Sequence, residues 1–253
     1  MYEDICYKNP FLKEVIFKAD FPSPPKNIAK ELPDKLLKAI LLRFPISEPQ
    51  KAHAQELQFA GDAVHAKKSE FMQWVFHGKS REKSLTITPD AFSYTNRSYE
   101  TYEKLVEDIV DILKVFFENL KDVTASRVGL RYINVISVNE NNPLVWKDYI
   151  NEEMLGVIDF HDENEFLTRA FHILEYNFDG LAVKYQFGIA NPDYPAVIRK
   201  KQFVIDVDAY SHGAFEHADI SQFIEDGHSK IQEIFEKTIT DKTRGLMEPQ
   251  DVE

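Results

Sequence analysis

A faint internal repeat is the sequence feature that most constrains how this 253-residue chain folds. Residues 85–119 align without a gap with residues 203–237, at a constant offset of 118 positions (203 − 85 = 118). Eight of the 35 aligned pairs are identical, whereas an average composition gives roughly two. The substituted pairs keep apolar residues in register, as Phe116 with Ile234 shows. The repeat therefore predicts a tandem duplication of one folding unit.

The spacing of apolar residues predicts the same order of elements in both halves, β-α-β-β-β-α. In the first half we expect strands at 14–21, 55–60, 70–77 and 85–94, and helices at 33–44 and 99–120. In the second half we expect strands at 127–138, 170–178, 181–189 and 202–210, and helices at 146–155 and 220–240. The dipeptide Asp179-Gly180 predicts a tight hairpin turn between two of these strands.

Hairpin-linked strands predict an α+β fold with a largely antiparallel sheet and the long helices packed on one face. The sequence leaves open whether the eight strands form one sheet or two. We expect the repeats at 1–122 and 123–253, both in one compact unit, with a polar tail that frays from about residue 241.

Four residues that close the apolar stripes of the long helices are expected in the core: Phe116, Phe117, Ile234 and Phe235. His228 lies beside the same stripe and is expected to pack at the boundary between helix and sheet. The spacing of Asp219 and Gln222 fits a capping box at the start of the last helix.

Composition excludes several classes of protein. The formal net charge of −12 opposes binding to a phosphate backbone, so we expect no nucleic-acid partner. The basic clusters at 79–83 and 199–201 are short, and we interpret them as solvated loops. Cys6 is the single cysteine, which excludes an intrachain disulfide. The start of the chain has no signal-peptide pattern, and no apolar run approaches the roughly 20 residues of a membrane span. We therefore expect a soluble cytoplasmic protein with no membrane partner.

Strong catalytic motifs are absent from the sequence: there is no glycine-rich phosphate loop, no G-x-S-x-G, no H-E-x-x-H and no zinc spacing. Asp206, Asp208 and His212 are weak acid–base or metal candidates, because two carboxylates on one strand face can ligate a divalent cation. Strand alternation explains the two aspartates equally well, since it turns them toward water while their neighbours pack inward. We expect no bound metal and no cofactor.

The strand that opens the second half carries the candidate binding residues. Alternation places Arg127 and Arg131 on one face, and Tyr132 and Asn134 on the other. Two arginines on one face could hold a carboxylate or phosphate of a ligand. They could equally pair with carboxylates of the chain itself, and Glu14 on the matching first strand is one candidate partner for Arg131. We take these five residues as the candidate ligand- or partner-binding set.

The chain resembles a sporadically distributed family of uncharacterised prokaryotic proteins of about this length. Three motifs carry the resemblance: the opening stretch Asn9–Phe17 (NPFLKEVIF), the central stretch Arg127–Asn134 (RVGLRYIN) and the ending stretch Phe235–Asp241 (FEKTITD). The resemblance implies a stand-alone cytoplasmic protein and brings no activity, cofactor or catalytic residue with it.

These observations favour a non-enzymatic binding or interaction protein of unknown partner. It would use the seam between the repeats or a sheet face to hold a protein or a small ligand. One alternative is an enzyme acting on a small anionic substrate, with Arg131 as the clamp and Asp208 or His212 as acid–base residue. A further alternative is a chaperone-like or antitoxin-like module of an accessory or defence system.

Overall fold

The computed structural model describes residues 5–23, 25, 28–60, 63–120, 123–158, 160 and 163–250, and for 54–60 and 63–69 it describes the backbone alone. Four helices are present in these ranges: α1 (Asp34–Arg43), α2 (Tyr102–Asn119), α3 (His217–Thr238) and α4 (Asp241–Met247). The strands are β1 (Cys6–Tyr7), β2 (Leu12–Asp20), β3 (Ile46–Ser47), β4 (Gln50–Ala60), β5 (Ala63–His77), β6 (Lys83–Ile87), β7 (Ala91–Asn96), β8 (Ala125–Ser137), β9 (Ala170–Phe178), β10 (Leu181–Ile189), β11 (Gln202–Phe215) and β12 (Pro249–Gln250).

Ten of the strands form one antiparallel sheet with helices packed against it, so the predicted α+β class is confirmed. The strand order is β3-β5-β6-β7-β2-β8-β11-β10-β9, and β4 pairs with β5 beside β3. The short strands β1 and β12 form a separate pair. No helix in the described part of the chain is long and apolar enough to cross a membrane.

Contacts along the chain divide it into two compact units. One unit comprises 1–15, 129–211 and 223–253, and the other comprises 16–128 and 212–222. Below, the unit that contains α1 and α2 is called the α2 unit, and the unit that contains most of α3 is called the α3 unit.

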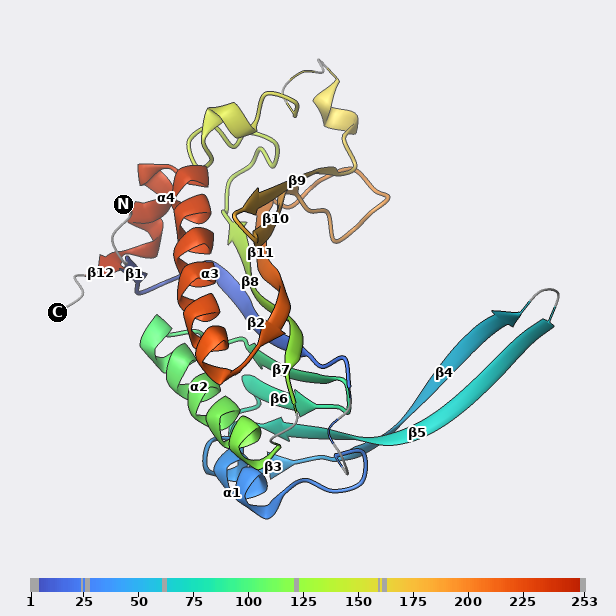
Figure 1. Ribbon diagram of the computed structural model, residues 1–253. Coiled ribbons are helices and arrows are strands. Elements are labelled where there is room, and N and C mark those ends of the chain that lie inside the picture. The colour runs from blue at the N-terminus through green and yellow to red at the C-terminus, as the bar shows by residue number, and fades with distance from the viewer. Residues whose placement is uncertain are drawn as a thin grey trace. The chain divides into compact units, whose positions relative to one another are not determined.

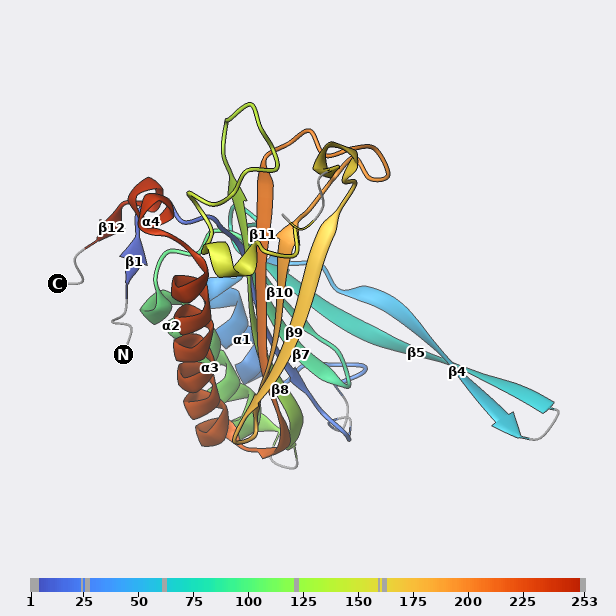
Figure 2. The same ribbon diagram turned by 90° about the horizontal axis from the view of Figure 1, so that it is seen from above.

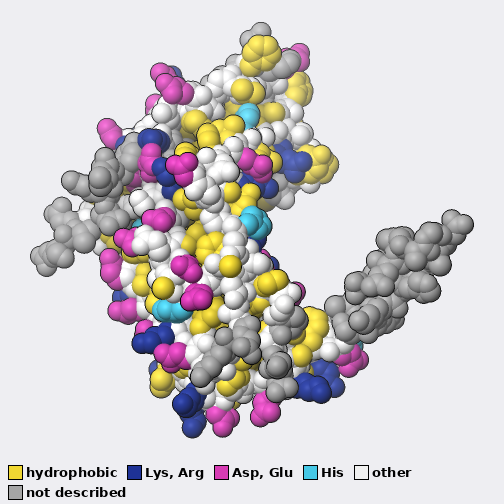
Figure 3. All heavy atoms as spheres, viewed as in Figure 1, with side chains coloured by type: hydrophobic (Ala, Val, Ile, Leu, Met, Phe, Trp, Pro, Cys, Tyr) yellow, Lys and Arg dark blue, Asp and Glu magenta, His cyan; other side chains and the backbone are white. Residues whose placement is uncertain are grey.

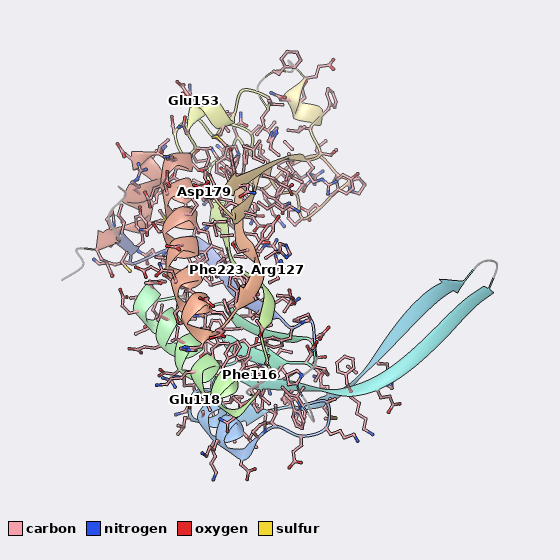
Figure 4. All side chains as sticks on the ribbon, in the orientation of Figure 1. Phe116, Glu118, Arg127, Glu153, Asp179 and Phe223 are labelled. Carbon is pink, nitrogen blue, oxygen red and sulfur yellow. The ribbon has the colours of Figure 1, made fainter. Side chains whose placement is uncertain are left out.

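The core of the α2 unit forms where α2 buries its apolar stripe against the strands (Figure 1). Phe116, labelled in Figure 4, stacks on Phe21 with ring centroids 5.2 Å apart and meets Phe92 edge-on at 5.8 Å. The side chain of Thr101 caps the first turn of α2 by accepting a hydrogen bond from the backbone N–H of Lys104. A polar cap and a wide apolar stripe explain why this segment is helical and which side faces the sheet.

In the α3 unit, α3 lies along β8, β10 and β11 (Figure 2). Gly227 faces Ala209 of β11 and Leu130 of β8, so this turn of the helix packs directly on the strands. A buried polar contact also joins α3 to β8. The Tyr132 hydroxyl lies 2.9 Å from Nδ1 of His228, which is buried at the boundary between helix and sheet as predicted.

The hairpin of β9 and β10 has the predicted bounds and register, with Phe178 opposite Leu181. Its turn places Asp179 at φ 51° and Gly180 at φ 99°, and a two-residue turn with both φ values positive is the type that Asp-Gly favours. Gly188 further along β10 has φ 148°, and a Cβ there would lie 2.1 Å from the Ala170 oxygen. Glycine is therefore required where the two strands approach most closely.

Several sequence-based expectations for individual elements were wrong. The segment 85–94 is a hairpin of β6 and β7, because Thr88 N–H donates to the Ala91 oxygen and closes a turn. The segment 146–155 contains only a 3-10 turn at Glu152–Met154. Each half therefore departs from the simple β-α-β-β-β-α order in its own way. Phe116 and Phe235 are buried as predicted, whereas Phe117 and Ile234 are half-buried.

Asp219 supports the start of α3, but the predicted capping box of Asp219 with Gln222 is wrong. The helix starts at His217, and the Asp219 carboxylate accepts a 2.8 Å hydrogen bond from the backbone N–H of Glu216. Asp219 is thus the third helical residue, which reaches back to the cap, and is not the cap itself.

The predicted frayed tail is instead folded up to Gln250. α4 begins at the Thr240 cap, and β12 pairs with β1, placing Tyr7 opposite Pro249. The physical reason is a buried carboxylate: Glu236 is almost fully buried and binds Arg244 Nε at 2.8 Å and the Tyr7 hydroxyl at 2.7 Å. An unpaired buried charge is costly, so these contacts hold the segments around Tyr7 and Arg244 in place.

The basic cluster at 199–201 was predicted to be a solvated loop, and this is wrong for Lys201. Its side chain is only 2% exposed, and Nζ lies 2.6 Å from Glu140 Oε2 and 5.0 Å from the centre of the Tyr149 ring. The Tyr149 hydroxyl also donates to Glu140. These hydrogen bonds, first from Lys201 and then from Tyr149, hold the pKa of Glu140 below its usual value.

We predict that Phe116→Ala destabilises the fold by about 3–5 kcal/mol, because it empties a fully buried aromatic site. Phe117→Ala is the matched control and should cost clearly less, since Phe117 is half-buried. Urea unfolding followed by circular dichroism measures both. Equal losses for the two variants would contradict the packing described for α2.

We also predict that part of the stability depends on ionised Glu140. Because the pKa of Glu140 is lowered in the folded state, its contribution is complete above the pKa of the unfolded chain and is lost as the pH falls through the folded value. Glu140→Gln should therefore flatten the loss of melting temperature below about pH 4.5, whereas the control Glu153→Gln should leave it unchanged. An unaltered acid profile for Glu140→Gln would count against the assignment.

Candidate functional site at the outer edge of β9

β9 is the last strand of the sheet order, and among the described residues its one strand partner is β10. Its outer edge therefore presents a row of backbone N–H and C=O groups without a strand partner. Such an edge can pair with another extended chain, and proteins usually block it with charges, proline or a bulge. β9 contains no proline and no glycine, and Glu175 is its single acidic or basic residue apart from His172.

Large apolar side chains remain exposed along this strand. We call the set Phe171, Ile173, Leu174, Tyr176 and Phe178 the β9 edge; each member is between 40% and 55% exposed. Of the 14 large apolar residues that are exposed in the described part of the chain, 11 lie between Val145 and Val197. Exposed apolar residues are therefore concentrated in this part of the chain and are not scattered over the surface. Contiguous apolar exposure marks interaction sites. Figure 3 shows apolar side chains at the surface of this region.

The β9 edge presents apolar groups on both faces of the sheet. Leu174 and Tyr176 lie opposite Tyr185 and Val183 of β10, which are buried on the α3 side. α3 reaches β9 at its end, where Lys230 Nζ lies 4.6 Å from the centre of the Phe178 ring. Phe171 and Ile173 alternate with these residues and point to the opposite face. A chain added to this edge would find apolar contacts on both sides.

The strands at the other end of the sheet order have a different composition. β3 and β4 pair with successive stretches of β5, and the β4 sequence carries Lys51, His53 and Glu56 among three glutamines. This is the protected composition expected of an edge strand. β9 has the composition of an interior strand, which the sequence shows as apolar residues without strict alternation. The sequence contains this run of apolar residues. Predicting a strand there did not show that the strand lies at an edge of the sheet.

Further apolar residues flank the start of β9. Phe166 precedes it by four positions and is exposed, and Tyr194 is exposed while Arg169 stacks on its ring at 4.6 Å. The backbone of this flank is ordered by hydrogen bonds, since Asn191 Nδ2 donates to the Thr168 oxygen at 2.9 Å. The apolar surface therefore continues beyond the strand, on a segment whose backbone is fixed by hydrogen bonds.

His172, in the same strand, stacks on Phe187 of β10 with ring centroids 5.1 Å apart. Its Nε2 is buried and has no hydrogen-bond partner. Buried polar atoms are nearly always paired in stable proteins.

Arg131, the central residue of the sequence-predicted site, binds Asp206 in a two-point contact. Arg131 Nε lies 2.7 Å from Oδ1 and Nη2 lies 2.5 Å from Oδ2. The pKa of Arg131 is raised, mainly by these hydrogen bonds to Asp206 and further by the charges of Asp208 and Glu14. Asp206 is 6% exposed, so Arg131 neutralises a buried carboxylate. The structure thus joins two separately predicted candidates as partners of each other.

The other predicted site residues do not form one surface with Arg131. Tyr132 and Asn134 are buried on the opposite face of β8, toward α3. Arg127 belongs to the α2 unit, where Nη1 lies 3.7 Å from Asp20 Oδ2. Glu14 contributes to Arg131 through its charge.

The candidate metal ligands Asp206, Asp208 and His212 fall on β11, and Asp206 is already bound to Arg131. In the ranges that the structure describes, no group of three or more His, Cys, Asp or Glu side chains is arranged to hold a metal ion.

A hollow of about 430 Å³ lies within the α2 unit, between the end of α2 and the start of α3. Lys114, Glu118, Glu216 and His217 line it together with Phe117. Both signs of charge are present, and His217 is bound to its own chain through Nε2, 3.2 Å from the Val110 oxygen. The lining favours no class of ligand.

Comparison with known proteins adds no information about function: no protein-family model matches the chain, and no curated protein matches it. The resemblance to a prokaryotic family therefore stays a prediction.

We predict that Arg131→Ala lowers stability by about 1–3 kcal/mol, because it leaves Asp206 buried without its partner. The double variant Arg131→Met with Asp206→Leu should recover part of this loss, since it removes both charges together. Urea unfolding of Arg131→Met, Asp206→Leu and the double variant measures the coupling. A stable Arg131→Ala protein would instead return Arg131 to the set of ligand-binding candidates.

Proposed function

We propose that this protein is a non-enzymatic binding protein that takes up an extended polypeptide segment at the β9 edge by strand addition. In this mode the main chain of the partner completes the hydrogen bonds of the open strand, and its alternate side chains meet the two faces. The observation that carries the proposal is an edge strand with exposed apolar residues on both faces and a single carboxylate.

The other proposed functions have less support. An enzyme acting on an anionic substrate needs a cationic clamp, and the guanidinium of Arg131 already binds Asp206 through Nε and Nη2. A chaperone-like or antitoxin-like module would also need an apolar surface for a partner, so it is a special case of the same proposal. The seam between the repeats stays a predicted site.

We also propose that the chain arose by tandem duplication. Two hairpins support this proposal: Ala60 lies opposite Ala63 in β4–β5, and Phe178 lies opposite Leu181 in β9–β10. The two registers differ by 118 positions (178 − 60 = 118), which is the offset of the sequence repeat. If the duplication is correct, β4 and β9 are equivalent strands that have diverged, one toward a protected edge and one toward an apolar edge.

The proposed function predicts binding of a simple strand-forming peptide. The probe is a fluorescent peptide of the length of β9 that alternates valine and threonine, with a lysine at each end. We expect the wild-type chain to bind it and Ile173→Lys or Tyr176→Lys to weaken binding at least about tenfold, which corresponds to ~1.4 kcal/mol. Both side chains are substantially exposed, so these variants should fold normally.

Two controls make the test specific. Leu42→Lys changes an even more exposed apolar residue, on α1, and should leave peptide binding unchanged. A peptide with a central proline cannot complete the hydrogen-bond ladder and should bind weakly. Fluorescence anisotropy measures all four proteins, and hydrogen exchange should show protection of residues 170–178. Equal binding by wild type and the two edge variants would overturn the proposal.

A further inference from the structure

We propose that the occupant of the β9 edge is the β9 edge of a second copy of this chain, paired antiparallel about a twofold axis at Leu174. The inference rests on the proposed function, because it needs the edge to accept a strand. It commits to one partner and one register, and both follow from the residues of β9.

The register follows from the length of the strand. A twofold axis perpendicular to the sheet keeps each side chain on its own face, so even-numbered residues meet even-numbered ones. Pairing about Leu174 is the register in which all nine residues of β9 have a partner. Leu174 then faces its own copy, and His172 faces Tyr176 of the other chain.

The side chains in this register are compatible. On the α3 side, Ala170 of one copy lies opposite Phe178 of the other, so a small side chain packs against a large one. On the other face, Glu175 meets Ile173, so the two Glu175 carboxylates are not opposed. Shifting the axis to Glu175 would bring these like charges together, which is unfavourable in a strand pair.

The exposed area is sufficient for a stable dimer. A large apolar side chain that is two-fifths exposed contributes roughly 80 Å², so the five residues of the β9 edge offer about 400 Å² per copy. The flanking side chains of Phe166 and Tyr194 are more than half exposed and add roughly 250 Å². Two copies could then bury at most about 1,300 Å², which reaches the lower end of the range of specific interfaces.

Sedimentation velocity over a range of protein concentrations tests the association. We expect a reversible dimer for the wild type, a dissociation constant at least about tenfold higher for Tyr176→Lys, and no change for Leu42→Lys. Each copy carries a formal charge of −12, so added salt should tighten the dimer by screening repulsion.

A cysteine substitution tests the register. In a Cys6→Ser background, Leu174→Cys would place the two thiols directly opposite each other, at a Cβ separation of about 4.5–5.5 Å, close to that of a disulfide. We expect rapid disulfide-linked dimer under mild oxidation, and slow linkage for Leu42→Cys in the same background.

The outcomes separate the two proposals. A dimer that is weakened by Tyr176→Lys and linked through Leu174→Cys supports self-pairing. A monomer at every concentration that still binds the strand-forming peptide overturns self-pairing and leaves the proposed function intact. A monomer that does not distinguish wild type from the edge variants in peptide binding overturns both. A dimer that Tyr176→Lys does not weaken overturns the assignment of the interface to β9.

Discussion

Burial of the helix stripes against the sheet is the interaction on which the rest of this structure depends. In the α2 unit, Phe116 contacts Phe21 and Phe92, and in the α3 unit the helix approaches the strands at Gly227. Because strand side chains alternate, covering one face of a strand fixes which residues point away from the helices. The polar pair of Arg131 with Asp206, on the face away from α3, follows from that choice.

The β9 edge is where local sequence and global position disagree. A strand with apolar residues on both faces is suited to the interior of a sheet, yet β9 ends the strand order. Folded proteins are locally consistent as a rule, and conflicts concentrate at functional sites. Strand addition would remove the conflict, since it turns β9 into an interior strand. The single carboxylate of Glu175 and the exposed ring of Tyr176 are compatible with such a neighbour.

Several charged residues that could be taken for a site instead stabilise the fold. Arg131 neutralises buried Asp206, Lys201 is buried against Glu140, and Arg244 binds buried Glu236. Each pair removes the cost of a charge that the fold has taken out of water. Their loss would lower stability before it affected any ligand.

The sequence by itself determined the local elements. The stripe of α2, the alternation of β2 and the Asp179-Gly180 turn are decided by residues close together in the chain, so they could be predicted with good bounds. The tertiary structure decided everything that depends on distant neighbours. It placed β9 at an edge, paired Arg131 with Asp206 across 75 positions, and folded the polar tail through Arg244 and Glu236. Periodicity reports which face of an element is apolar, but the neighbour that covers the face is chosen by packing.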